Sequence, residues 1–212
     1  MNQNSANGVL SAVADYYSAK LAQFGATPLG VDWNGEESQQ LRFAQLVNLI
    51  ELRSGFTLND LGCGYGALFD YLSLHFQDFF YTGCDISRDM IDAATLRHIT
   101  CRNATFVATD KPPGIADFAI ASGIFNVRLG VEDLEWFSYL RTTLDVLDSC
   151  SRRGFSFNCL TSYSDSAKMQ PHLYYADPCV IFDLCKRQYS RNVALLHDYG
   201  LYEFTVLVRK NQ

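Results

Sequence analysis

The sequence lacks the features of a membrane-spanning, secreted or nucleic-acid-binding protein. No hydrophobic run approaches the roughly 18 residues of a membrane span, so we expect no span. Residues 1–8 are polar, without the basic and apolar regions of a secretory signal. The net charge of −6 leaves no basic excess for a nucleic-acid groove, which makes nucleic acid an unlikely partner. With 48% hydrophobic residues, the chain is also neither disordered nor collagen-like.

Disulfide and metal frameworks are missing as well. The seven cysteines are odd in number and form no CxxC pair, which favours reduced thiols in a cytoplasmic protein. Histidine and cysteine are dispersed, and Asp165, Asp177 and Asp183 do not form a compact ligand set. We therefore expect no metal site.

What the sequence does have is an alternation of short apolar runs with helical patterns. The expected strands are 56–61, 79–86, 104–110, 116–122 and 154–160, and the expected helices between them are 66–76, 88–98 and 132–148. Asp177 and Pro178 are typical of a helix start, which predicts a further helix near 178–189. Two adjacent strand patterns, 192–200 and 201–210, can pair only as an antiparallel hairpin.

This alternation predicts an α/β fold in a single domain. Strands that alternate with helices form βαβ units, whose mostly parallel sheet is covered by helices on both faces. Before the first strand, apolar residues recur at helical spacing in 9–21 and 41–50, and a loop rich in breakers and aromatics lies between them at 24–38. The chain length suits one domain.

The sharpest motif is TLNDLGCGYG at residues 57–66, where a predicted strand runs into a glycine-rich turn. Gly62, Gly64 and Gly66 permit a tight turn and let a ligand approach the backbone and the following helix N-terminus. Asp85 ends the next predicted strand about 20 residues further on, the spacing at which an acid accepts hydrogen bonds from a ribose. Together these features predict an adenosine-type ligand at the tips of parallel strands.

Two ligands fit this pattern. Gly62, Gly64 and Ala67 also satisfy GxGxxG/A, so a nicotinamide or flavin dinucleotide is an alternative. Asp60 argues against it, since a carboxylate beside the loop would repel a pyrophosphate. S-adenosylmethionine has no phosphate there, and its ammonium and sulfonium would pair favourably with Asp60.

The sequence resembles the class I S-adenosylmethionine-dependent methyltransferases, in particular bacterial small-molecule enzymes. DLGCGYG resembles their glycine motif, GCDISRDMIDAA the motif whose acid holds the ribose, FVATDKP the motif whose acid meets the adenine amino group, and ADFAIASGIFNVRL the strand beside the transferred methyl group. The resemblance implies a Rossmann-like three-layer sandwich with a seven-stranded sheet and an antiparallel C-terminal hairpin. It also implies division into an N-terminal helical cover at 1–55, a cofactor-binding core at 56–130 and a C-terminal half at 131–212.

The resemblance implies a set of residues for the cofactor. YYSAKLAQFGATPLGVDWNGEESQQLRF resembles a lead-in that closes over the methionine end, where Arg42 would clamp the carboxylate and Tyr17 and Trp33 would pack. The full set expected to contact the cofactor is Tyr17, Trp33, Arg42, Asp60, Gly62, Cys63, Gly64, Gly66, Asp85, Ile86, Asp110 and Ser122. Cys63 is a small filler in the loop rather than a nucleophile.

The sequence contains no single set of residues that identifies the site of the methyl acceptor. Asn126 and Arg128 follow the fourth strand, where the acceptor should lie. The aromatic and polar segment 163–178 follows the fifth strand, on the ligand side of the sheet. Within it His172 is the proposed general base, because histidine is the side chain best suited to take up and release protons near neutral pH. We expect Asn126 and Tyr174 to assist catalysis, and Arg128, Tyr163 and Tyr175 to bind the substrate.

The predicted function is methyl transfer from S-adenosylmethionine to a small molecule, with oxygen favoured over nitrogen as acceptor and a sugar or surface-polysaccharide precursor as a fitting class. ASGIF stands where amino-methylating nucleic-acid enzymes carry an Asn or Asp before Pro-Pro and an aromatic. The alternatives are an NAD-dependent oxidoreductase and a non-catalytic S-adenosylmethionine-binding protein. We expect a monomer or a homodimer.

Overall fold

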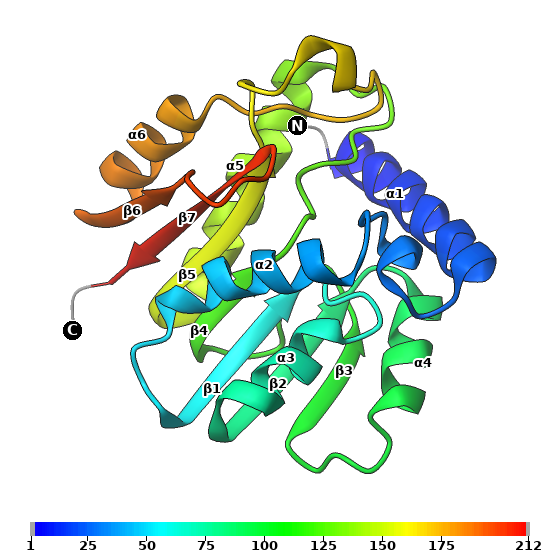
Figure 1. The fold of residues 1–212 in the computed structure, drawn as a ribbon, viewed down its shortest axis with the longest axis vertical. Coiled ribbons are helices and arrows are strands. Elements are labelled where there is room, and N and C mark those ends of the chain that lie inside the picture. Colours follow the sequence, from blue (N-terminus) through cyan, green and yellow to red (C-terminus); the bar gives the residue numbers. More distant parts are fainter. Residues whose placement is uncertain (1–2, 211–212) are drawn as a thin grey trace.

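A seven-stranded sheet forms the centre of the computed structural model, which describes residues 3–210, with side chains from residue 10 (Figure 1). The strand order is β3-β2-β1-β4-β5-β7-β6. The strands are β1 (Ser54–Leu61), β2 (Gln77–Asp85), β3 (Ala104–Ala108), β4 (Ala116–Ala121), β5 (Ser151–Leu160), β6 (Asn192–Leu196) and β7 (Glu203–Arg209). Only β7 runs antiparallel to its neighbours, β5 and β6. The predicted mostly parallel sheet with a C-terminal hairpin is confirmed.

Helices cover the two faces of the sheet, so the predicted three-layer sandwich is also confirmed. One face carries α2 (Glu36–Leu46), α3 (Ala67–His75) and α4 (Arg88–Arg97), whereas α5 (Asp133–Ser149) and α6 (Pro178–Gln188) pack on the other. The first helix, α1 (Gln3–Phe24), lies beyond the tips of the central strands (Figure 1). Three short 3-10 helices complete the set, η1 (Pro28–Val31), η2 (Val47–Leu49) and η3 (Ser166–Lys168).

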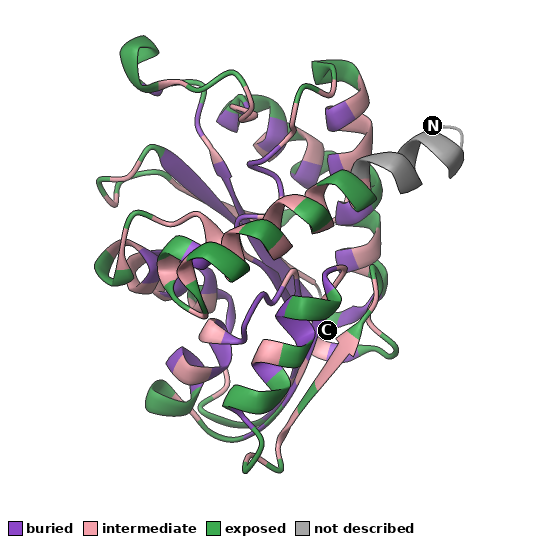
Figure 2. Cartoon of the chain, turned by 90° about the vertical axis from the view of Figure 1, so that its right-hand side faces the viewer, coloured by how far each residue is buried: buried purple, intermediate pink, exposed green. Residues whose placement is uncertain are grey.

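Two hydrophobic clusters pack against the sheet, one on each face. Figure 2 shows the central strands as largely buried between them. The cluster beneath α2, α3 and α4 is rich in aromatic rings, with Phe56, Phe79 and Tyr81 buried among them. The cluster beneath α5 and α6 is centred on Phe155, Phe157 and the leucines of α5. Many of the chain's phenylalanine and tyrosine rings therefore pack in these two clusters.

Local signals account for the helix starts. The carboxylate of Asp177 accepts hydrogen bonds from the amide nitrogens of Cys179 and Val180, at 2.8 and 3.2 Å, and Pro178 occupies the first turn of α6. Gly35 caps α2, whose first turn carries Glu36 and Glu37. The start of α6 agrees with the sequence prediction.

The connection from β3 to β4, residues 109–115, contains no helix. The face of β1 and β4 on this side is accordingly polar in part: Asp117 accepts hydrogen bonds from the amide and the hydroxyl of Thr57, both at 2.8 Å. Because no helix intervenes here, α5 is left facing the strand ends directly. This short connection shapes the site described below.

We predict that Gly154→Ala strongly destabilises the fold. Gly154 has a φ of +149°, and a Cβ there would lie 2.2 Å from the carbonyl oxygen of Val208 on β7. The substitution should lower the unfolding free energy by about 2–4 kcal/mol in chemical denaturation. Gly114→Ala, where a Cβ meets no atom within 4 Å, is the matched control and should change it by less than about 0.5 kcal/mol. Equal stability of the two variants would show that the β5–β7 contact is misplaced.

Candidate functional site

The glycine-rich turn after β1 requires glycine at each predicted position. Gly62, Gly64 and Gly66 have φ angles of +78°, +53° and +84°, in the left-handed region that L side chains rarely adopt. A Cβ on Gly62 would also lie 2.1 Å from Cγ2 of Ile124, and one on Gly66 would lie 2.8 Å from Nε2 of His98. The loop is thus closely packed from behind, and its residues 62–64 line the cavity described below.

Asp85, at the end of β2, fastens this turn. One carboxylate oxygen accepts from the amide of Gly64 and the other from the amide of Ser87, each at 2.9 Å. Burial raises the pKa of Asp85, and these amide hydrogen bonds act against that rise. Each carboxylate oxygen can accept a further hydrogen bond, so Asp85 remains able to receive a ribose hydroxyl.

Asp60 is a buried carboxyl near the end of β1. Its Oδ2 accepts a hydrogen bond from the hydroxyl of Tyr81 at 2.5 Å, whereas its Oδ1 is buried without any partner in the described part of the chain. Burial raises the pKa of Asp60 to about 7, and the nearby charge of Asp85 adds to the rise, while the Tyr81 hydrogen bond lowers it. A carboxyl in this state is suited to a cationic partner brought by a ligand.

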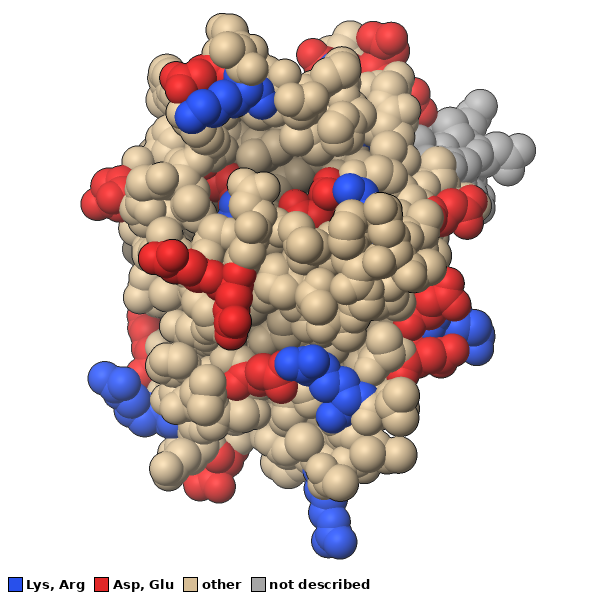
Figure 3. Space-filling model, turned by 45° about the vertical axis from the view of Figure 1, so that its right-hand side comes forward, with Lys and Arg blue, Asp and Glu red and all other residues tan. Residues whose placement is uncertain are grey.

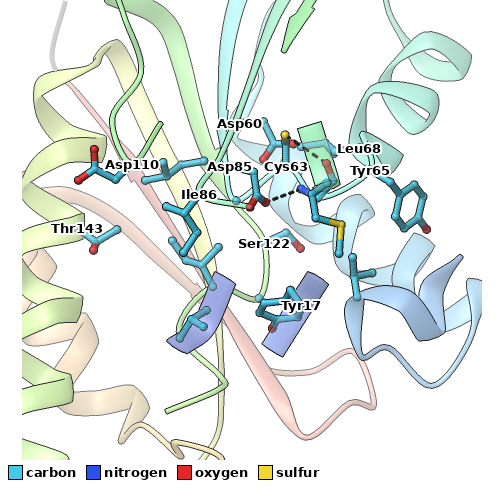
Figure 4. A pocket seen from close by; sticks show the side chains of 18 of the residues that line it. Tyr17, Asp60, Cys63, Tyr65, Leu68, Asp85, Ile86, Asp110, Ser122 and Thr143 are labelled. Carbon is cyan, nitrogen blue, oxygen red and sulfur yellow. Dashed lines mark hydrogen bonds between the residues drawn. The ribbon is translucent and has the colours of Figure 1, made fainter. Parts of the chain in front are cut away.

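A cavity of about 700 Å³ lies over these two acids. Figure 4 shows Asp60 and Asp85 side by side within it, with Tyr17 and Ser122 nearby and Asp110 further along the wall. The face drawn in Figure 3 is hollowed, with acidic side chains at the rim of the hollow. The cavity is lined by ten residues of the predicted cofactor set: Tyr17, Trp33, Asp60, Gly62, Cys63, Gly64, Asp85, Ile86, Asp110 and Ser122.

The helix α1 forms one wall of the cavity. Leu10, Val13 and Tyr17 face the cavity, and burial raises the pKa of the Tyr17 hydroxyl. The hydroxyls of Ser18 and Ser87 lie 2.9 Å apart and join α1 to the start of α4. The helix is therefore docked against the start of α4 beside the cavity, and the expected cover over the methionine end of the cofactor stays a prediction.

The remaining members of the predicted set have other surroundings. Cys63 is buried and burial holds the pKa of its thiol well above the ordinary range, which agrees with a filler rather than a nucleophile. Gly66 caps α3 and does not line the cavity. Arg42 does not line it either: its guanidinium stacks on Trp33, with Cζ 4.0 Å from the ring centre, and its Nε bonds Glu203.

Sequence reasoning missed the contribution of α5. Tyr139, Thr142, Thr143 and Val146 of this helix line the cavity, because no helix follows β3 to separate α5 from the strand tips. Lys111, in the same short connection, is the one cation among the lining residues within the described chain. The absence of a helical pattern at 109–115 was the signal in the sequence that could have revealed this opening.

The predicted acceptor residues lie together but outside the cavity lining. The amides of Arg128 and Leu129 donate to the carbonyl of His172, at 3.0 and 3.1 Å, and the amide of Tyr174 donates to the carbonyl of Asn126 at 2.8 Å. These bonds join the segment after β4 to the segment after β5. The two segments form a paired cover at the carboxyl edge of the sheet.

Several side chains of the predicted acceptor residues make contacts within this cover. Asn126 Oδ1 accepts from the amide of Leu160 at 3.1 Å, and the guanidinium of Arg128 pairs with Asp133. The hydroxyl of Tyr175 accepts from the amide of Gln170 at 2.8 Å. Tyr163 is exposed, and burial raises the pKa of Tyr174 to about 12. Roles in catalysis or substrate binding for these residues and for His172 stay predictions.

The described residues, 3–210, contain neither a cluster of metal ligands nor a membrane-spanning helix. No group of three or more His, Cys, Asp or Glu side chains is placed to hold a metal ion. Within the same range, no helix combines the length and the apolar character needed to cross a membrane.

Comparisons with known proteins agree with this site. A family described as "Methyltransferase domain" matches residues 59–153, from within β1 to the start of β5. A protein of Mycobacterium tuberculosis named as a methyltransferase, Rv1506c, is 57% identical over 164 residues, which cover 77% of this chain and 99% of that protein. The chain belongs to the class I S-adenosylmethionine-dependent methyltransferases.

Solved structures show the same methyltransferase fold. The complex of DhpI with S-adenosylhomocysteine has a TM-score of 0.68 at 16% identity, over 95% of this chain and 96% of that one. Magnesium protoporphyrin IX methyltransferase from Synechocystis PCC 6803 has a TM-score of 0.66 at 14% identity, over 95% and 99%. The N-methyltransferase NodS from Bradyrhizobium japonicum WM9 gives 0.65 at 17%, over 94% and 98%.

We predict that this methyltransferase binds S-adenosylhomocysteine more weakly as the pH falls below about 7. The raised pKa leaves Asp60 protonated below that value, so it cannot pair with the ligand's ammonium until it gives up the proton. The dissociation constant should rise by about tenfold per pH unit below the pKa and level off above it. Calorimetric titration from pH 5.5 to 8.5 measures this.

Asp60→Asn is the control for this prediction, because asparagine has a similar shape but does not ionise. It should bind weakly with a flat pH profile between pH 6 and 8. A wild-type profile that is equally flat would mean that Asp60 carries no charge relevant to the ligand.

Proposed function

We propose that this protein catalyses methyl transfer from S-adenosylmethionine to a small-molecule acceptor. The observation that carries the proposal is the pair of carboxyls at the tips of neighbouring strands, the buried Asp60 and the half-buried Asp85, in one cavity over the glycine turn. Asp60 Oδ1 is buried and unpartnered among the described residues, and so is the hydroxyl of Ser122 in the same cavity. Unpaired buried polar atoms are costly, and the polar groups of a bound cofactor would satisfy both.

Each side chain has a distinct part in holding the cofactor. Asp60 would pair with the ammonium and lie near the sulfonium, Asp85 would accept from the ribose hydroxyls, and Asp110 would accept from the adenine amino group. Ile86 would pack on the adenine ring. S-adenosylmethionine, when bound, supplies an electrophilic methyl group. The chain's task is then to align the acceptor in line with that methyl group and to accept its proton if it is a hydroxyl.

The acceptor is proposed to be a small molecule, with oxygen favoured over nitrogen and a sugar or surface-polysaccharide precursor as the class to test. The acidic net charge of −6 opposes a nucleic-acid acceptor. Structural neighbours include a magnesium protoporphyrin IX methyltransferase and an N-methyltransferase, so nitrogen acceptors belong in the same panel. We propose a cytoplasmic location from the reduced cysteines, and a monomer or homodimer.

A nicotinamide dinucleotide fits the cavity less well. Its pyrophosphate would lie on the glycine turn, close to the buried carboxyl of Asp60, and an anion in a low-dielectric site repels it. A protein that binds S-adenosylmethionine without turnover is the second alternative, and an acceptor panel separates it from an enzyme.

Thermal unfolding tests which cofactor the protein binds. S-adenosylhomocysteine at a hundredfold excess over its dissociation constant should stabilise the protein by about 2.7 kcal/mol, whereas NAD should produce no shift. Asp85→Ala should abolish the shift because the ribose loses its acceptor. Stabilisation by NAD alone would contradict the proposed function, and an unchanged shift in Asp85→Ala would show that the ribose binds elsewhere.

Steady-state kinetics of a His172 variant test the proposed general base. His172→Ala should slow methyl transfer to a hydroxyl acceptor by about 100-fold, since a general base contributes an effect of this order. Its affinity for S-adenosylhomocysteine should not change. His75→Ala, at the exposed end of α3, is the control and should keep full activity. Full activity in His172→Ala as well would remove His172 from the mechanism.

A further inference from the structure

A buried ion pair lies behind the end of the cavity formed by Trp33 and Gly123. Arg42 of α2 donates from Nε to Oε2 of Glu203 at 2.8 Å, and the two side chains are only 7% and 1% exposed. The same Oε2 accepts from Nδ2 of Asn158 at 2.6 Å. Glu203 is the first residue of β7 and pairs with Leu160, the last residue of β5, so it belongs to the carboxyl edge of the sheet.

The pair is connected to the cavity wall at two points. Arg42 stacks on Trp33, with Cζ 4.0 Å from the ring centre. Asn158, held by Glu203, accepts a hydrogen bond through Oδ1 from the amide of Gly123 at 2.8 Å. Trp33 and Gly123 both line the cavity and touch each other, since a Cβ on Gly123 would lie 2.5 Å from the indole ring.

Not every polar atom of the Arg42–Glu203 pair has a hydrogen-bond partner among the described residues. Nη1 of Arg42 and Oε1 of Glu203 are buried without a hydrogen-bond partner among the described residues, as is the hydroxyl of Ser122 beside Gly123. Because Glu203 occupies Nε, the opposite edge of the guanidinium is left for another acceptor. A guanidinium held on one side in this way is pre-organised for a ligand carboxylate.

We propose that Glu203 is a positioning residue for the methionine end of the cofactor site. It fixes Arg42 on Trp33, directly behind the cavity wall, so that the free Nη1 meets the cofactor's carboxylate at this end of the site. Through Asn158 it also holds the backbone of Gly123 beside the transferred methyl group. The inference rests on the proposed function and deepens it, because it assigns a residue of the last strand to the cofactor that the first half of the chain binds.

A purely structural role for the pair makes a different prediction. If Glu203 only joins α2 to β7, its loss destabilises the whole site and weakens every ligand alike. A ligand without the amino-acid group therefore separates the two roles. 5′-Methylthioadenosine provides one, because it has the adenosine and the sulfur of S-adenosylhomocysteine but neither its carboxylate nor its ammonium.

The experiment compares both ligands by calorimetric titration in wild type and Glu203→Gln. We expect S-adenosylhomocysteine to bind about tenfold more weakly or worse in the variant, and 5′-methylthioadenosine to stay within about twofold of wild type. Glu51→Gln is the matched control: Glu51 pairs with Nε of Arg209 at 3.1 Å at the opposite edge of the sheet. It should leave both affinities unchanged.

A loss shared equally by the two ligands, or no loss for either, would overturn the positioning role while leaving the cofactor assignment intact. Failure of the wild type to bind either ligand would instead overturn the proposed function. If Glu203→Gln does not fold, Arg42→Met/Glu203→Gln removes both charges and leaves neither unpaired. That variant should show the same selective loss, and wild-type affinity for S-adenosylhomocysteine would contradict the proposal.

Discussion

The turn after β1 is the constraint on which the rest of the site depends. The amides of Gly62 and Cys63 both donate to the carbonyl of Cys84, at 2.7 and 3.0 Å, and the amide of Gly64 donates to Asp85. These bonds fold the end of β1 against the end of β2, which brings Asp60 and Asp85 into one cavity. The left-handed backbone at Gly62, Gly64 and Gly66 strongly favours glycine, so the glycine spacing in the sequence is linked directly to the geometry of the site.

The buried carboxyl of Asp60 determines which ligand charge the cavity favours. Asp60 lies without a full set of partners where burial raises its pKa, and a cationic ligand relieves that cost. The methionine end of S-adenosylmethionine brings this positive charge. In the proposed arrangement the buried Arg42–Glu203 pair would offer its free Nη1 to the carboxylate at the same end. Each charge of the cofactor's amino-acid group would then have a partner of opposite charge.

The sequence predicted the sheet and the glycine turn well because both depend on local patterns. Alternating apolar runs, helix caps such as Asp177 and the glycine spacing are short-range signals, and they determined the topology. The cavity walls depend on long-range packing, which no single segment encodes. Tyr139 and Thr143 reach the cavity only because the β3–β4 connection is short, and Glu203 meets Arg42 across 161 positions of the chain. The acceptor residues were the least predictable, since His172 and Asn126 belong to two loops whose pairing follows from the assembled sheet edge.

A crystal structure with S-adenosylhomocysteine bound tests the central claim most directly. The account predicts the ribose hydroxyls on the carboxylate of Asp85, the ammonium beside Asp60 and the sulfur facing Ser122, with the adenine toward Asp110. An adenosine bound away from the glycine turn, or a ligand whose ribose makes no contact with Asp85, would contradict it.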